Sequence, residues 1–141
     1  MKKSLNFKLI ITFLIISILF TKATFSQIKI GDKREDGIVY FVDSTGKHGL
    51  IADIKDSKKM NWNKAKSSCE ERGNGWHLPT KDELDKLYQQ KDLVGDFDNF
   101  YYWSSTLDKK DNPWGQNFAN GIPQIGTTKI IRVCVRAVKS F

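Results

Sequence analysis

The sequence predicts an α+β fold in which two helices pack on small antiparallel sheets beside a long loop-rich region. Three observations predict it. An apolar, β-branched segment folds back through a turn, two stretches of helical periodicity follow it, and the region after residue 95 is crowded with Gly, Asp, Asn and Pro. Strand and helix periodicities that occupy separate segments of one short chain are typical of an α+β domain.

The first 26 residues have the composition of a secretory signal peptide. Three lysines lie at the start, residues 9–20 form an apolar run broken only by Thr12 and Ser17, and small or polar residues follow. Twelve residues are too few to span a bilayer, which takes about 20. We therefore expect a signal peptide over 1–26 and a secreted, periplasmic or cell-surface protein, with an uncleaved anchor as the alternative.

The remaining residues, 27–141, are enough for a single domain with its own core. The whole chain carries 23 basic and 16 acidic residues, but four of the basic ones and none of the acidic ones lie in residues 1–26. The exported part therefore has a net charge of only +3. This mild balance, together with export, argues against a nucleic-acid partner and leaves acidic glycans and cell surfaces as compatible ones.

The two cysteines, Cys69 and Cys134, both lie in the exported part. Paired thiols in an oxidising compartment usually form a disulfide, which here would stabilise the fold by about 4 kcal/mol in the chain-entropy model. A metal site and a reactive thiol pair are the alternatives. Neither His48 nor His77 lies at ligand spacing from a cysteine, and we expect the disulfide.

A β-hairpin is predicted at the start of the domain. Residues 37–42 are continuously apolar and rich in β-branched and aromatic side chains, and residues 50–52 form a second apolar run. Between them, residues 43–47 have the Asp, Ser, Thr and Gly content of a turn.

Two helices are predicted next. In residues 61–73, Trp62, Ala65 and Cys69 recur at helical spacing, with Asn61 as N-cap and Gly73 as C-cap. The second helix covers about residues 80–90. Pro79 prevents a helix from running through it, and Thr80 and Glu83 have the spacing of a reciprocal capping box.

The loop-rich half contains shorter strands, predicted at residues 101–104, 115–118 and 129–138. The last of these alternates clearly. Its odd-numbered apolar residues from Ile131 to Ala137 point one way, and the even-numbered residues from Arg132 to Val138 point the other.

This order of elements, with one cysteine in the first helix and one in the last strand, resembles the C-type lectin-like fold. Within that fold the chain is similar to the bacterial Lcl C-terminal domain family, a domain of unknown function. The matching motifs cover nearly all of residues 31–141: DGIVYF at 36–41, GKHGLIA at 46–52, Trp62 with Ala65 and Cys69, LPTKDEL at 78–84, YWSST at 102–106, WGQNF at 114–118 and VRAV at 135–138.

The resemblance implies a recognition module, because characterised relatives include surface adhesins that recognise glycosaminoglycan-like or other host glycans. Ligands of lectin-like domains usually meet the loop-rich half, here about residues 95–124. Aromatic faces suit sugar rings, and amides and hydroxyls suit sugar hydroxyls. The candidate ligand-binding residues are therefore Tyr101, Tyr102, Trp103, Ser105, Trp114, Gln116, Asn117 and Asn120, and the alternative for the two tryptophans is a place in the core.

The sequence indicates calcium binding and contacts to an acidic glycan less strongly. Two clusters, Asp96, Asp98 and Asn99 and then Asp108, Asp111 and Asn112, could offer oxygen ligands to calcium, but turn residues explain them better. We predict no metal and no cofactor. Lysines at 58–59 and 109–110, Lys129, Arg132 and Arg136 could contact an acidic glycan if exposed.

An enzyme is the remaining alternative, because the LPT motif with Glu83 also occurs in formylglycine-generating enzymes of related fold. Those enzymes depend on a reactive cysteine pair, whereas both cysteines here occupy structural positions. We therefore expect a protein without catalytic activity. A structural or protein-binding subunit of a bacterial envelope assembly is the main competing function, with the membrane involved only through the signal segment.

Overall fold

The computed structural model describes residues 27–34, 37–124 and 128–141. The predicted signal peptide lies outside these ranges. The described chain is a mixed α+β structure with two small sheets and a few short helices. In the described ranges, no helix has the length and apolar character needed to cross a membrane.

One sheet has four strands, all antiparallel to their neighbours, in the order β1-β2-β3-β9. Its strands are β1 (Lys33–Arg34), β2 (Gly37–Val42), β3 (Gly49–Asp53) and β9 (Val138–Ser140). The second sheet has five strands in the order β4-β8-β5-β6-β7, and only β5 and β8 pair in parallel. Its strands are β4 (Ser57–Met60), β5 (Tyr101–Leu107), β6 (Pro113–Asn117), β7 (Pro123–Gln124) and β8 (Val133–Val135).

The predicted hairpin is confirmed as β2 and β3. Asp43 organises the turn, because its Oδ1 accepts hydrogen bonds from the backbone N–H and the hydroxyl of Thr45 at 3.1 and 2.7 Å. Gly49 begins β3 where a Cβ atom would lie 2.2 Å from the Phe41 carbonyl oxygen. The return strand therefore needs glycine at this point.

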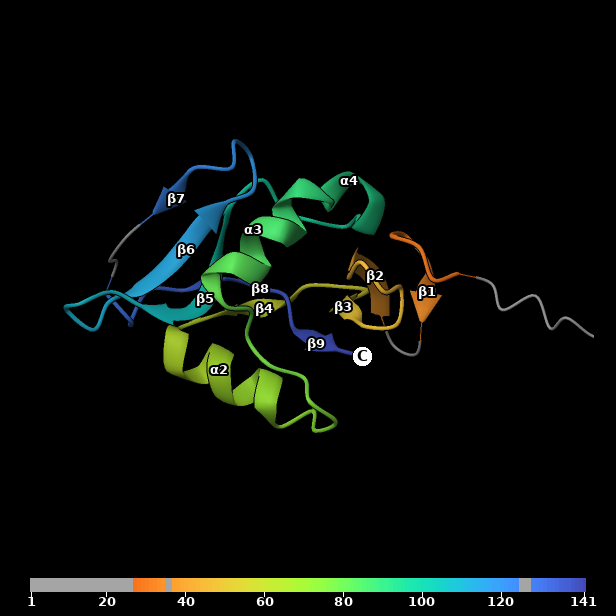
Figure 1. Cartoon of the computed structure of the whole chain (residues 1–141). Coiled ribbons are helices and arrows are strands. Elements are labelled where there is room, and N and C mark those ends of the chain that lie inside the picture. Colours follow the sequence, from red (N-terminus) through yellow and green to blue (C-terminus); the bar gives the residue numbers. More distant parts are fainter. Residues whose placement is uncertain (1–26, 35–36, 125–127) are drawn as a thin grey trace, which may run out of the picture.

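Both predicted helices are present. The first, α2 (Trp62–Glu70), has Asn61 as its N-cap, as predicted, but ends three residues before Gly73. The second, α3 (Lys81–Gln89), begins with the predicted capping box of Thr80 and Glu83. A further short helix, α4 (Lys91–Val94), follows α3 almost directly and was not predicted. In Figure 1, α2 and α3 lie on opposite sides of the strands β4, β5 and β8.

The prediction of one strand over residues 129–138 is wrong. The chain pairs as β8 in the five-stranded sheet, leaves it after Val135, and joins β3 of the other sheet as β9. Between the two strands, the Ala137 carbonyl accepts from the Asp53 N–H at 2.9 Å. This segment therefore connects the two sheets.

Arg136 lies in that connection and is completely buried. Its Nε donates to Asp56 Oδ1 at 2.6 Å, and its two terminal nitrogens donate to backbone carbonyls of two loops, at Asp53 and Ile54 and at Gly95 and Asp96. The guanidinium carbon also lies 4.0 Å from the centre of the Phe97 ring. Arg136 is therefore a structural residue, and it is not available to a ligand.

The core is divided into two clusters by the faces of β8 and β5. Val133 and Val135 face the cluster that contains α2, whereas Cys134 faces the other cluster, which contains α3. The alternation predicted for this strand is therefore confirmed within β8.

The same alternation makes the predicted Cys69–Cys134 disulfide wrong. Cys69 on α2 packs among the residues of the first cluster, and Cys134 points away from them on the opposite face of β8. Both are buried free thiols, and the Cys134 Sγ lies 3.6 Å from Asp98 Oδ2. A bridge would require one of the two side chains to cross the sheet.

Candidate functional site

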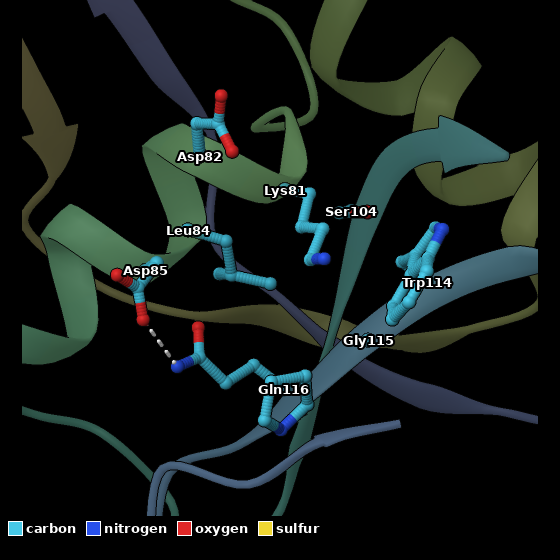
Figure 2. A pocket seen from close by; sticks show the side chains of 9 residues that line it. Lys81, Asp82, Leu84, Asp85, Ser104, Trp114, Gly115 and Gln116 are labelled. Carbon is cyan, nitrogen blue, oxygen red and sulfur yellow. Dashed lines mark hydrogen bonds between the residues drawn. The ribbon is translucent and has the colours of Figure 1, made fainter. Parts of the chain in front are cut away.

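A cleft of about 280 Å³ lies between the start of α3 and the strands β5 and β6. The helix contributes charged side chains and the strands contribute an indole ring, an amide and a hydroxyl (Figure 2). Its lining residues are Lys81, Asp82, Leu84, Asp85, Ser104, Trp114, Gly115, Gln116 and Pro123.

The pairing of β5 with β6 places these strand residues on one face. Tyr102 lies opposite Gln116 and Trp103 lies opposite Gly115, so the even-numbered residues of both strands point toward α3. Trp114, Gln116 and Ser104 therefore reach the cleft, while Tyr102 continues the same face into the buried core.

Gln116 fixes the distance between β6 and α3. Its Nε2 donates to Asp85 Oδ1 at 3.0 Å and to the Gly121 carbonyl at 3.1 Å, and the other Asp85 oxygen accepts from Gln89 at 2.8 Å. Figure 2 shows the Asp85–Gln116 bond crossing from the helix to the strand. Since two acceptors face the nitrogen, the amide orientation is determined. Gln116 is only 4% exposed but lines the cleft, and its Oε1 makes no hydrogen bond with the described residues.

Lys81 and Trp114 form the other side of the cleft. The Lys81 Nζ lies 3.9 Å from the centre of the Trp114 ring, a cation–π contact. The backbone N–H of Lys81 donates to Thr106 Oγ1 at 2.9 Å, which ties the first residue of α3 to β5. The indole ring is only half-buried. The flexible side chain of Lys81 therefore covers the face of the indole ring that lines the cleft.

The capping box holds the start of α3 in place. Glu83 Oε2 accepts from the Thr80 N–H at 2.7 Å, and the Glu83 N–H donates to Thr80 Oγ1 at 3.2 Å. His77 extends this motif, because its Nε2 lies 3.2 Å from both Glu83 carboxylate oxygens and its Nδ1 lies 2.9 Å from the Gly75 carbonyl.

Both partners of this ion pair have shifted pKa values. The hydrogen bond to Glu83 raises the pKa of His77 above its usual range, against an opposing effect of burial. Burial would raise the pKa of Glu83, but its hydrogen bonds with His77 and Thr80 outweigh that effect and lower it. Since both imidazole nitrogens face acceptors, only the protonated ring satisfies both.

The predicted ligand-binding residues do not form one site. Only Trp114 and Gln116 line the cleft, while Tyr101 and Trp103 belong to the opposite face of the sheet. Trp103 is 1% exposed and its Nε1 donates to the Met60 carbonyl, so its alternative place in the core is the one the structure shows.

The other four predicted residues have structural contacts. Tyr102 is buried and its hydroxyl donates to Asp56. Asn117 and Asn120 accept backbone N–H groups of the β6–β7 turn through their side-chain oxygens, at 2.8 and 3.1 Å. Ser105 is half-buried, and its N–H donates to the Pro79 carbonyl at 2.7 Å.

The sequence did not identify the helix residues of the cleft. Lys81 and Asp82 lie within the capping motif and Asp85 follows it on α3, whereas ligand binding was predicted only for about residues 95–124. Their side chains project from α3 at helical spacing. No pattern in the sequence indicates that β6 lies across from that helix, so only the tertiary arrangement brings them to Trp114.

The two thiols lack the features of a reactive pair. Burial raises the pKa of Cys69 to about 12 and that of Cys134 to about 11. Thiols of such high pKa stay protonated at neutral pH and are poor nucleophiles and metal ligands. In the described part of the chain, no group of three His, Cys, Asp or Glu side chains gathers as metal ligands would.

The two aspartate clusters of the loops have contacts of their own. Asp108 accepts from the backbone of Lys110 and Asn112 at 2.8 and 2.9 Å, and Asp98 pairs with Lys59 at 3.3 Å. These contacts are those of turn and surface residues.

Comparison with known proteins places most of the chain in one family. The profile of the Lcl C-terminal domain matches residues 34–139. The crystal structure of botrocetin aligns with 76% of this chain and 98% of its own chain, at 15% sequence identity and a TM-score of 0.47. No curated protein matches the sequence.

Proposed function

Because the chain belongs to the Lcl C-terminal domain family, we propose that it is an exported, non-catalytic recognition module that binds a glycan through the cleft between α3 and β6. We further propose that its fold is C-type lectin-like, with the cleft at the edge of the loop-rich half. The order of hairpin, two helices, long loops and terminal strands supports this proposal.

The observation that carries the proposal is the pairing of a half-buried indole with a fixed amide. Trp114 offers a flat apolar face of the kind that packs against a sugar ring. Gln116 Oε1 offers an acceptor held in position by two hydrogen bonds on the adjacent nitrogen. Binding pockets typically combine an apolar surface with a few positioned polar groups, and this cleft has both.

The charges of the cleft favour a neutral or weakly charged sugar over a polyanion. Lys81 stands beside Asp82 and Asp85, so the local field is mixed. To stack on the cleft side of Trp114, a sugar must displace the Lys81 ammonium, which can then donate to a ring hydroxyl.

The absence of catalysis is part of the proposal. Both thiols are buried with raised pKa values, which disfavours the oxidase chemistry of formylglycine-generating enzymes. Incubating the purified protein with a cysteine-containing sulfatase peptide and copper should leave the peptide cysteine unchanged by mass. Conversion to formylglycine would overturn this part.

A glycan array with the purified protein, with and without EDTA, tests the binding function. We expect a defined set of neutral or amino-sugar glycans to bind in both conditions, and W114A to lose them by about tenfold or more in affinity. L93A and K110A are matched controls, because Leu93 is 60% exposed on α4 and Lys110 is exposed on the β5–β6 loop. The absence of glycan binding, together with tight co-purification of an envelope protein, would instead support the structural-subunit alternative.

A further inference from the structure

A second hollow of about 240 Å³ lies on the face of the five-stranded sheet opposite the cleft. It is lined mainly by aromatic and branched apolar side chains, and two of them reach solvent: Phe100 is 44% exposed and Ile131 is 39% exposed. Gly115 leaves its floor free of a side chain. The complete lining consists of Phe100, Tyr101, Trp103, Gly115, Gln124, Ile131, Arg132 and Val133.

A basic hollow adjoins it and shares Arg132. Its lining residues are Lys58, Met60, Asn61, Lys64 and Arg132, so the described residues give it three cations and no acidic side chain. All three cations are exposed, and none forms an ion pair within the described ranges. Arg132 is oriented by its Nε, which donates to the Lys59 carbonyl at 3.1 Å, and its terminal nitrogens make no hydrogen bond with any residue that the structure describes.

We propose that this continuous apolar and basic surface, formed by Phe100, Tyr101, Ile131, Arg132, Lys58 and Lys64, is a docking site for an acidic protein segment that carries one large apolar side chain. The apolar residue occupies the hollow beside Phe100 and Ile131. Its neighbouring carboxylates meet Arg132 and the two lysines, and Arg132 forms the bidentate pair.

Size and charge together favour this occupant. A hollow of about 240 Å³ lined mainly by aromatic and branched side chains suits one apolar anchor side chain. Interface hot spots have this design, in which a buried aromatic anchor is combined with a charged partner. A sulfated glycan would use the cations but would leave the aromatic hollow unfilled, whereas an acidic segment with an apolar side chain would use both.

This docking surface is independent of the proposed glycan cleft, since the two lie on opposite faces of β5 and β6. Among the described residues, only Gly115, which has no side chain, lines both. A failure of glycan binding would therefore not contradict the docking proposal, and a failure of peptide binding would not contradict the proposed glycan cleft.

Fluorescence anisotropy with three labelled peptides tests the proposal on the purified protein. The probes are a heptapeptide of aspartates with a central tryptophan, the same peptide with a central serine, and a heptapeptide of lysines with a central tryptophan. We expect only the first to bind well, with the serine peptide at least about tenfold weaker. F100A and R132A should each weaken the first peptide by about tenfold, whereas L93A and K110A, the matched apolar and basic controls, should leave it unchanged.

Two results would overturn the proposal. Equal affinity for the tryptophan and serine peptides would mean that charge alone drives binding. Dextran sulfate that binds more tightly than the acidic tryptophan peptide and depends on Arg132 but not on Phe100 would assign the surface to an anionic polysaccharide. Thermal unfolding of each variant confirms that it is folded, and the comparison of the three peptides needs no variant at all.

Discussion

The start of α3 and the segment between β8 and β9 both satisfy polar groups with hydrogen bonds, but they find their partners at very different distances along the chain. Thr80, Glu83 and His77 bond to one another within six residues. Arg136 bonds to groups 40 to 83 residues away, in two separate loops. The first motif is determined locally, whereas the second forms only when both sheets are in place.

The largest loss of stability is expected when Arg136, which bonds to distant loops, is replaced. R136M leaves Asp56 without its cation and four carbonyl contacts unmade, and breaking a buried ion pair in this way typically costs about 3–5 kcal/mol. Urea unfolding of R136M against wild type measures the loss. R132M is the matched control, because Arg132 is exposed, and it should change stability by less than about 0.5 kcal/mol. Equal small effects of the two variants would contradict the structural role of Arg136.

A smaller loss is expected at the local motif. T80A removes the hydroxyl that accepts from the Glu83 N–H, and loss of an N-cap costs about 1 kcal/mol. T80S keeps the hydroxyl and should remain within a few tenths of a kcal/mol of wild type. If T80S were as destabilised as T80A in the same urea titration, the methyl group, and not the cap, would be responsible.

The pH dependence of stability should report the His77–Glu83 pair. The raised pKa of His77 stabilises the fold below its unfolded value near 6.5 and loses the effect as pH rises through the folded pKa. The lowered pKa of Glu83 stabilises the fold above about 4.5 and loses the effect as pH falls through the folded pKa.

The stabilising contributions of His77 and Glu83 are both present between about pH 4.5 and 6.5. The His77 side chain is about one third exposed, so solvent screening limits the gain to less than about 1 kcal/mol. Subtracting the unfolding free energy of H77Q from that of wild type at each pH isolates the pair. We expect the difference to be greatest in this window and to decline at pH 8, and a flat profile would contradict the pairing.

The smallest expected effect concerns the cysteines. Since Cys69 and Cys134 lie on opposite sides of β8 as free thiols, adding a reductant should not move the urea midpoint, and a thiol reagent in denaturant should count two thiols. If the two cysteines formed a disulfide, reduction would instead lower the stability of the protein by about 4 kcal/mol. The thiol reagent would then count no free thiols in the unreduced protein.

The comparison also explains what could be predicted from the sequence. The hairpin, Asn61, and the capping box depend on residues close together in the chain, and they were predicted with nearly correct bounds. The alternation through Val133, Cys134 and Val135 was also predicted.

The face of β8 on which α2 packs depends on tertiary structure alone, and that choice decides against the disulfide. The split between β8 and β9 has the same origin, because Arg136 is drawn into the core by carbonyls of distant loops. The residues of the cleft likewise include some that local sequence indicated and some that only the tertiary structure brings together. The aromatic and amide content of β6 indicated Trp114 and Gln116, but nothing local indicated that Lys81 and Asp85 face them.

The central claim is that ligand recognition occurs in the cleft between α3 and β6. The most direct test is a titration of isotope-labelled protein with the glycan that binds most strongly on the array, followed by nitrogen–proton NMR spectra. We predict that the indole N–H of Trp114 and the side-chain amide of Gln116 shift on binding, while the signals of Phe100, Ile131 and Arg132 stay in place. Shifts confined to those three residues, with Trp114 and Gln116 unchanged, would contradict the claim.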